Sequence, residues 1–292
     1  MYYVVYGILW LISLLPLRVL YVLSDACYGI LFYISKYRRD IVMSNLKIVF
    51  PEKTEMERVA IAKQFYHNLV DTFIETIKMI SASPAFIQKH FKGNWEVINN
   101  LIPNGRKVHV HLGHNFNWEW GNAAAAKRIE MPFVGAYMPL KNKTFDKLFY
   151  NLRSRYGTLL VRATNMREDM IKHRNTQYMI GLATDQNPGH PASALWFKFF
   201  GRPAPFLSAP AKFAITNSCA VIFGFIHKKK RGYYEVVFTL IEENSANTTE
   251  VELTRKFVRY MEGVIQNYPD MWLWSHRRFK HQWKEEYGEV RE

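Results

Sequence analysis

The sequence predicts an α/β fold: a central, mostly parallel sheet flanked by helices, with an N-terminal helical segment that anchors the chain to a membrane. Three observations lead to this prediction. An uncharged apolar run opens the chain, a long stretch with helical periodicity follows, and from Lys107 onward short apolar runs alternate with helical stretches. Such alternation is typical of a buried sheet whose strands are joined by helices.

The opening segment is strongly apolar. Tyr2–Leu15 carries no charge, and a second apolar stretch, Val19–Ile34, is interrupted by Asp25. Fourteen helical residues cover only ~21 Å of a hydrocarbon core about 30 Å thick. The first run therefore favours a short tilted span, a re-entrant element or an interfacial anchor, and no basic region or clean cleavage site marks it as a secretory signal.

Basic residues follow the apolar segment directly. Lys36, Arg38 and Arg39 predict, by the positive-inside rule, that the rest of the chain lies on the cytoplasmic side of the membrane. We therefore expect a membrane anchor over residues 1–35 and a single catalytic domain over residues 36–292, with a helical lead-in over residues 36–90. Two cysteines in the whole chain imply no disulfide framework, which agrees with a reducing compartment.

Two long amphipathic helices are predicted. Between Thr54 and Ile80 apolar residues recur at three- and four-residue steps, and Thr54 with Glu57 has the spacing of a capping box. A second helix is predicted over Asn247–Asn267, where Pro269 ends the pattern. Between them lie six apolar runs that we interpret as strands: KVHVHL, MPFVGAYM, TLLVRA, YMIGLAT, AVIFGFIH and YYEVVFTLIE.

The net charge limits the class of partner. A formal charge of +14 and a pI near 9.6 indicate an anionic partner: nucleic acid, an anionic membrane surface or an acidic substrate. The chain has no recognisable helix-turn-helix, zinc-finger or ribonucleoprotein motif, and its basic residues adjoin the apolar segment. We therefore expect membrane contact and no nucleic-acid partner. The basic run HKKKRG, His227–Gly232, is interpreted as a solvated hairpin turn.

The sequence VHVHLGHNFNWEWGNAAAA, Val108–Ala126, contains the strongest chemical signal. His114 stands five residues before Glu119, a spacing that separates two side chains by roughly 140° within one continuous helix. The two converge if His114 lies in the turn after a strand and Glu119 in the first turn of a helix capped by Asn115 or Asn117. Glu119 would then orient the imidazole as it takes a proton from a hydroxyl group.

A metal site is the competing interpretation. His109, His111 and His114 crowd one strand end, where alternate residues face one side and histidines often bind zinc. The nearest carboxylates, Glu119 and Asp185, complete no recognisable ligand motif. A metal-dependent hydrolase therefore stays the alternative, and we expect no metal and no other cofactor.

Five blocks in order along the chain resemble the bacterial lipid A biosynthesis acyltransferases, a family of lauroyl and myristoyl transferases related to the lysophospholipid acyltransferases. The resemblance runs from about residue 38 to about residue 280. The blocks are RRDIVMSNLKIVFPE (Arg38–Glu52), GHNFNWEWGN (Gly113–Asn122), ATDQNP (Ala183–Pro188), FFGRPAPF with the following APAKFA, and WLWSHRRFK (Trp272–Lys280).

The resemblance implies transfer of a fatty acyl chain from an acyl carrier protein thioester to a hydroxyl of a lipid A precursor, on the cytoplasmic face of the bacterial inner membrane. It implies His114 as general base and Glu119 as the residue that orients it. Related members acylate other lipids, so an amino-acid lipid or another lysolipid is the alternative acceptor. The expected substrate-binding residues are Arg167, with Arg162 as a rival, Asp185, Gln186, Arg277 and Arg278.

Overall fold

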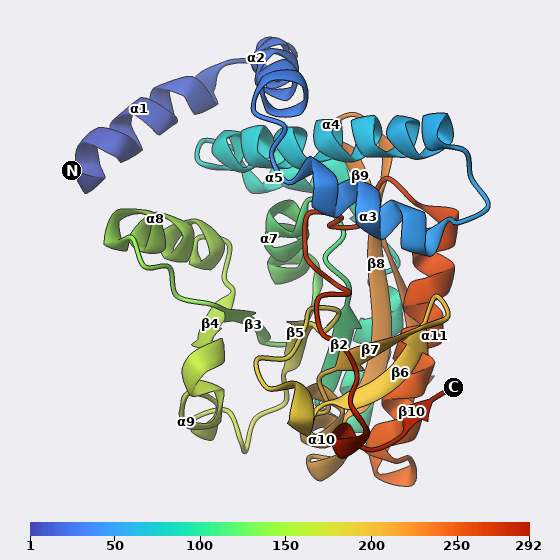
Figure 1. The fold of residues 1–292 in the computed structure, drawn as a ribbon. Coiled ribbons are helices and arrows are strands. Elements are labelled where there is room, and N and C mark those ends of the chain that lie inside the picture. The colour runs from blue at the N-terminus through green and yellow to red at the C-terminus, as the bar shows by residue number, and fades with distance from the viewer.

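The structure is a computed structural model that describes all 292 residues. Its centre is a seven-stranded sheet in the order β1-β9-β8-β2-β5-β3-β4 (Figure 1). Every neighbouring pair is parallel except the hairpin β8–β9. The strands are β1 Phe91–Gly93, β2 Val108–Leu112, β3 Phe133–Tyr137, β4 Leu159–Arg162, β5 Met179–Ala183, β8 Ala220–Lys230 and β9 Tyr233–Glu242.

The predicted fold class is confirmed, because each of the six apolar runs forms a strand of a mostly parallel sheet flanked by helices. A small second sheet, which the sequence did not indicate, contains β6 Leu195–Phe199, β7 Arg202–Phe206 and β10 Val290–Arg291. The helices are α1 Tyr2–Leu14, α2 Leu17–Gly29, α3 Arg39–Val49, α4 Glu55–Met79, α5 Pro84–His90, α6 Glu96–Asn99, α7 Trp118–Arg128, α8 Lys143–Ser154, α9 Met166–Ile171, α10 Ala209–Thr216 and α11 Glu250–Asn267.

The register of the central strands determines which loops meet. Leu112, the last residue of β2, pairs with Ala183, the last residue of β5. Because the two strands are parallel, the residues just beyond these ends leave the sheet at the same edge. The loops after β2 and β5 therefore lie side by side, although about seventy residues separate them in the sequence.

Helix α4 begins as the sequence predicts. The Thr54 side chain accepts a hydrogen bond from the Glu57 backbone, and the Glu57 carboxylate accepts one from the Thr54 amide, so two of the otherwise unpaired first amides are satisfied. The helix crosses the top of the sheet in Figure 1 and supports the N-terminal helices. Helix α11 matches the second predicted helix and ends two residues before Pro269.

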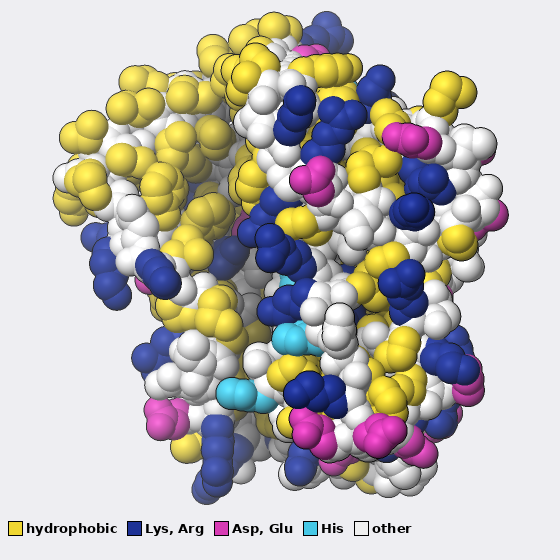
Figure 2. Space-filling model, in the orientation of Figure 1, with side chains coloured by type: hydrophobic (Ala, Val, Ile, Leu, Met, Phe, Trp, Pro, Cys, Tyr) yellow, Lys and Arg dark blue, Asp and Glu magenta, His cyan; other side chains and the backbone are white.

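The N-terminal helices differ in how they contact the body. Residues Leu17–Ile34, which comprise α2 and a π-helical extension, form one helix long and apolar enough to cross a membrane by length and composition. Leu20 and Phe32 on this helix are buried in the main hydrophobic cluster. Helix α1 contacts α4 and α8 but leaves most of its apolar side chains exposed, and Figure 2 shows hydrophobic side chains gathered over this region.

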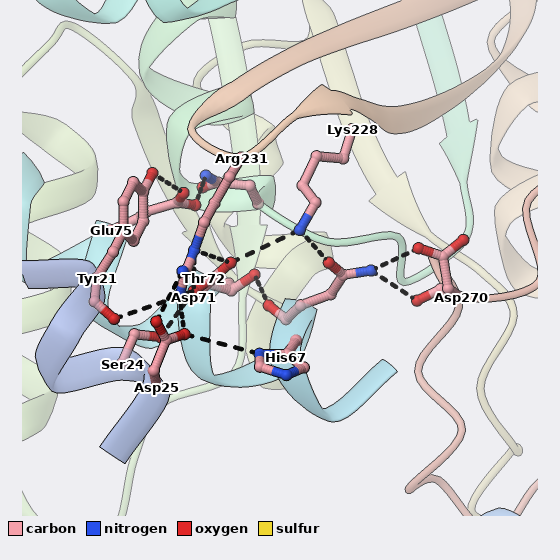
Figure 3. Close-up of polar contacts among 12 residues, drawn as sticks. Tyr21, Ser24, Asp25, His67, Asp71, Thr72, Glu75, Lys228, Arg231 and Asp270 are labelled. Carbon is pink, nitrogen blue, oxygen red and sulfur yellow. Dashed lines mark hydrogen bonds and ion pairs between the residues drawn. The ribbon is translucent and has the colours of Figure 1, made fainter. Parts of the chain in front are cut away.

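The tip of the β8–β9 hairpin is less solvated than predicted. Arg231 donates hydrogen bonds to the buried Asp71 of α4 and to Asp25 of α2, and Lys228 forms an ion pair with Asp71 at 3.6 Å (Figure 3). The sequence indicated a turn but could not indicate the carboxylates that face it. The basic tip thus fastens α2 and α4 to the sheet.

Candidate active site

His114 lies two residues beyond the end of β2, against Asp185, which lies two residues beyond the end of β5. The His114 Nδ1 atom is 2.5 Å from Asp185 Oδ1, and the His114 backbone amide donates to Asp185 Oδ2 at 2.9 Å. The Trp272 indole donates to the same Oδ2 at 2.7 Å. Three donors therefore fix the Asp185 carboxylate, which in turn fixes the His114 ring.

The pKa values of His114 and Asp185 shift in opposite directions because each group stabilises the charged form of the other. Burial alone would lower the pKa of His114, but the charge of Asp185 and the hydrogen bond to it outweigh burial and raise that pKa. Burial alone would raise the pKa of Asp185, but His114 outweighs it and lowers the pKa to about 2. Asp185 is therefore ionised at neutral pH, and in the neutral ring the proton lies on Nδ1, which leaves Nε2 as an acceptor.

The Nε2 atom of His114 faces Gln186, whose side-chain amide nitrogen lies 3.1 Å away. Asp185 and Gln186, which the sequence analysis expected to bind substrate, thus both lie against His114, and their role in binding substrate stays a prediction. Asp185 is 3% exposed, which gives a substrate no access to it in this structure. The His114 side chain is 22% exposed and lines a cavity.

Glu119, expected to orient His114, forms no hydrogen bond with His114 in this structure. Its carboxylate pairs with Arg153 of α8, whose Nε and Nη2 atoms donate to it at distances between 2.6 and 3.2 Å. The Trp118 indole adds a bond at 3.2 Å. Burial would lower the pKa of Arg153, but the bonds to Glu119 outweigh it and raise that pKa. Glu119 and Arg153 therefore form a charged pair beside the histidine.

The start of α7 brings Glu119 to the cavity. Asn117 takes a left-handed conformation, with φ 64° and ψ 41°, and its side-chain oxygen accepts from the Trp120 amide at 3.3 Å. This is the predicted helix cap, supplied by the second of the two candidate asparagines. Asparagine tolerates this backbone region better than most residues, so the chain can turn sharply between His114 and Trp118.

A cavity of about 330 Å³ opens beside these groups. His114, Glu119, Asn122 and Arg153 supply its polar side chains, and most of its remaining lining is hydrophobic. A Cβ atom at Gly121 would lie 3.0 Å from Ile226 and 3.2 Å from Phe91, so a side chain on this face of α7 would crowd the cavity wall. The apolar lining away from the charges includes Phe91, Trp95, Ile226, Val236 and Phe238.

The C-terminal block Trp272–Lys280 encloses the Asp185 loop. Asn187 donates to the Arg277 carbonyl at 2.7 Å and accepts from Arg278 Nη1 at 2.8 Å. From the other side, Asn45 of α3 donates to the carbonyls of Trp274 and His276, each at 2.8 Å. The α3 block, the ATDQNP loop and the C-terminal block are thus hydrogen-bonded together, although they are far apart in the sequence.

Arg278 is fully buried. Its guanidinium lies over the rings of Phe199 and Phe206, at 5.3 and 4.2 Å from the ring centres, which brings the FFGRPAPF block into the same assembly. Burial lowers the pKa of Arg278 to about 10. Its expected role in binding substrate stays a prediction, as does that of Arg277, which is exposed.

Arg167 lies on α9, exposed to solvent, and does not line the cavity. Its rival Arg162 is paired with Asp169. The arginine that the structure places at the cavity is Arg153, which the sequence analysis missed. Its only local signal is a position on an amphipathic helix beside the buried Leu152, and nothing in that signal indicates a carboxylate partner.

His109 and His111 are buried in β2 and are not gathered with His114. The His109 ring packs near Phe213 and the His111 ring near Phe223, and burial lowers their pKa values to about 3 and about 4. No three histidine, cysteine, aspartate or glutamate side chains are placed to hold a metal ion together. The metal-hydrolase alternative therefore gains no support from the geometry.

Comparison with known proteins decides the family. A family model described as bacterial lipid A biosynthesis acyltransferase matches residues 1–281. The chain belongs to this family. The lipid A biosynthesis lauroyltransferase of Escherichia coli (strain K12) is 25% identical over 284 residues, which cover 94% of this chain and 89% of that protein. The palmitoleoyltransferase of the same organism is 24% identical over 287 residues, with the same coverage.

The family assignment confirms the resemblance based on the five sequence blocks, and it identifies the chain as an acyltransferase with a lipid acceptor. In this member of the lipid A acyltransferase family, the five sequence blocks contact one another in the folded chain. Hydrogen bonds and cation–π contacts join four of them around Asp185 and Asn187, and the second block supplies His114.

Proposed function

We propose that this protein transfers a fatty acyl chain from an acyl carrier protein thioester to a hydroxyl of a lipid A precursor, with His114 as the general base. One observation carries the proposal: a buried carboxylate holds Nδ1 of His114, which leaves Nε2 as an acceptor, and His114 lines a largely apolar cavity. A base of this kind suits a hydroxyl nucleophile, and the cavity suits an acyl chain.

The reaction follows from the proton positions. His114 Nε2 takes the proton of the acceptor hydroxyl as the oxygen attacks the thioester carbonyl, and the ionised Asp185 stabilises the imidazolium that forms. When the intermediate collapses, the C–S bond breaks and the thiolate takes the proton from Nε2. Gln186 must yield its contact with Nε2 to the incoming hydroxyl. No covalent acyl-enzyme is needed.

Glu119 has a different role in this proposal from the one the sequence indicated. It holds Arg153 by two of the three guanidinium nitrogens, which leaves Nη1 free to donate. A guanidinium on the cavity wall stabilises the oxyanion that develops on the thioester carbonyl or binds a phosphate of the acceptor. Glu119 is thus a positioning residue for Arg153.

We place the enzyme on the cytoplasmic face of the bacterial inner membrane, with α1 and α2 in contact with lipid. The apolar side chains of α1 are exposed, and Lys36, Arg38 and Arg39 follow α2 directly. Met138, which is 62% exposed, lines the cavity, and Leu140 and Phe145 are exposed close to it in sequence. This apolar surface suits entry of a lipid acceptor from the bilayer.

The decisive experiment is an acyl-transfer assay with purified full-length protein in detergent. Acyl carrier protein loaded with a single fatty acid is the donor, a phosphorylated lipid A precursor is the acceptor, and the ester is measured by mass spectrometry. We expect His114→Ala to reduce kcat/KM by ~10²- to 10⁴-fold. Arg167→Ala is the matched control and should keep wild-type activity. Full activity in folded His114→Ala would exclude the proposed mechanism.

The alternative acceptor is tested with the same protein and donor. An amino-acid lipid and a lysophospholipid, each with one free hydroxyl, replace the phosphorylated disaccharide in parallel assays. Ester formation only on the phosphorylated sugar supports the proposal. Formation only on either of the others assigns the alternative acceptor while leaving the role of His114 intact.

A further inference from the structure

Glu75 of α4 is a fully buried carboxylate beside the start of α7. Its Oε1 atom accepts from the Tyr21 hydroxyl at 2.7 Å, and its Oε2 atom accepts from the Tyr234 hydroxyl at 2.7 Å and from the Asn117 amide at 2.6 Å. Figure 3 shows Tyr21 and Glu75 pointing toward each other at the edge of the larger polar network. Its three side-chain partners come from α2, β9 and the start of α7.

The bond to Asn117 is the informative one. The same asparagine caps α7, because its side-chain oxygen accepts from the Trp120 backbone amide. An amide group has one oxygen and one nitrogen, so it caps the helix only in one of its two orientations. Glu75 selects that orientation, since its oxygen that faces the amide nitrogen accepts a hydrogen bond from it. The Glu75 backbone carbonyl also accepts a hydrogen bond from the Trp120 indole at 2.8 Å.

The capped helix start carries the groups that line the cavity. Trp118 and Glu119 are the first two residues of α7 and follow Asn117 directly. A flipped Asn117 amide would leave the Trp120 amide without its acceptor and would place two donors or two acceptors face to face. The first turn of α7, held in place by a left-handed residue, would then shift and would carry Glu119 and its partner Arg153 with it.

We propose that Glu75 is a positioning residue for acyl transfer: it fixes the Asn117 amide and thereby the first turn of α7, and through Tyr21 it ties that turn to the apolar helix α2. The assembly of the cavity thus depends on α2 being seated on α4. This inference rests on the proposed function, because the rate it affects is that of acyl transfer.

The first test reverses the polarity of the pair. Glu75→Gln keeps one acceptor oxygen where Glu75 has two, so it cannot accept from Asn117 and from Tyr21 through separate oxygens, and Asn117→Asp presents a second carboxylate to Glu75. Each single variant therefore weakens the contact. In the double variant the introduced glutamine can donate to the introduced aspartate, which still caps the helix with its other oxygen. We expect each single variant to lower kcat about 10-fold with little change in KM, and the double variant to recover to within about threefold of wild type.

Tyr234→Phe is the matched control, because it removes a hydrogen bond to the same Glu75 oxygen without touching Asn117. A role in folding alone predicts equal losses of thermal stability and unchanged kcat in Glu75→Gln and Tyr234→Phe. We expect both variants to unfold at lower temperature, and only Glu75→Gln to lose kcat. Equal kcat in the two, or a double variant no more active than the singles, overturns the proposal.

If Asn117→Asp does not fold, Asn117→Gly, which suits the left-handed backbone, replaces it as the single variant and should lose kcat as Glu75→Gln does.

A spectroscopic measurement separates this inference from the proposed function. The indole N–H signals of Trp118 and Trp120 report the bonds to Glu119 and to the Glu75 carbonyl, and they are read from a ¹H–¹⁵N spectrum without any substrate. The chemical shifts of both indole signals should change in Glu75→Gln and return to their wild-type values in the double variant. In Tyr234→Phe the Trp118 signal should keep its wild-type chemical shift. A Trp118 signal unchanged in Glu75→Gln overturns the inference whether or not the enzyme acylates the chosen lipid.

Discussion

Two buried carboxylates support this enzyme, and their pKa values move in opposite directions. Asp185 and Glu75 are both almost fully buried, and each accepts hydrogen bonds from three donors. Burial would raise both pKa values, but His114 lowers that of Asp185 to about 2, whereas neutral donors leave that of Glu75 raised to about 7. Burial therefore does not determine the charge of a carboxylate. The decisive factor is whether a neighbour can take a positive charge.

In the proposed mechanism, this difference separates the site that performs chemistry from one that holds structure. The partner of Asp185 is a titratable imidazole that lines the cavity, so in the proposed reaction its charge matters. The partners of Glu75 are two phenols and an amide, which remain neutral and fix positions only. Substitutions at the first site should change the rate and its pH dependence. Substitutions in the network around the second should act mainly on stability, apart from the bond to Asn117.

The largest effect after loss of His114 itself is expected for Asp185→Asn. The asparagine no longer stabilises the imidazolium and can hold the wrong tautomer, so kcat/KM should fall by ~10²- to 10⁴-fold. Activity requires neutral His114 and is lost as pH falls through the raised pKa of that residue. Without the carboxylate this pKa drops, so the acid limb of the kcat/KM profile should move to lower pH. An acid limb at the same pH as in the wild type would contradict the pairing of His114 with Asp185.

Arg153→Met should have the next largest effect. It leaves Glu119 as a buried carboxylate without its partner and removes the guanidinium from the cavity wall, and we expect kcat/KM to fall by ~10- to 10³-fold. The control is Arg167→Met on α9, which should keep wild-type kcat/KM because this side chain is exposed and away from the cavity. Steady-state kinetics on both variants decides between the two arginines. Equal losses would restore Arg167 as a functional residue.

Trp95→Ala tests whether the apolar cavity binds the acyl chain. Removal of the indole enlarges the cavity and leaves room for a longer acyl chain. The kcat/KM for longer acyl donors, relative to that for the chain length preferred by the wild type, should therefore rise about 10-fold. Each additional buried methylene contributes roughly 0.8 kcal/mol to this ratio. Competition between acyl carrier proteins loaded with chains of different length, read by mass spectrometry, measures this ratio. A loss of activity that is equal for all chain lengths would mean that the chain binds elsewhere.

The smallest effect on rate is expected for Arg231→Met. Its loss leaves the buried Asp71 with only Ser24 and Lys228 as side-chain partners, which should destabilise the fold by about 3 kcal/mol and lower the melting temperature by several degrees. The kcat value measured well below that temperature should stay within about twofold of wild type. A large loss of kcat in folded protein would show that the whole network, rather than Glu75 alone, acts on the active site.

Local patterns predicted much of the fold. The capping box at Thr54 and Glu57, the six strands and the cap of α7 involve residues within a few positions of one another, and their signals do not depend on the rest of the chain. His114 at a strand end was singled out for the same reason, whereas Asp185 was indicated by the resemblance to the family. The cationic hairpin tip was recognised as a turn, but its carboxylate partners were not.

The sequence by itself determined the strands of the central sheet and the family, and it singled out His114 as the candidate general base. Only the tertiary structure decided which side chains His114 and Glu119 contact. Glu119 is near His114 in sequence but turns to Arg153, whereas Asp185, 71 residues away, takes the place beside the imidazole. The physical reason is strand order: β2 and β5 are parallel neighbours in register, so the residues beyond their ends must meet, and no local pattern specifies which strands become neighbours.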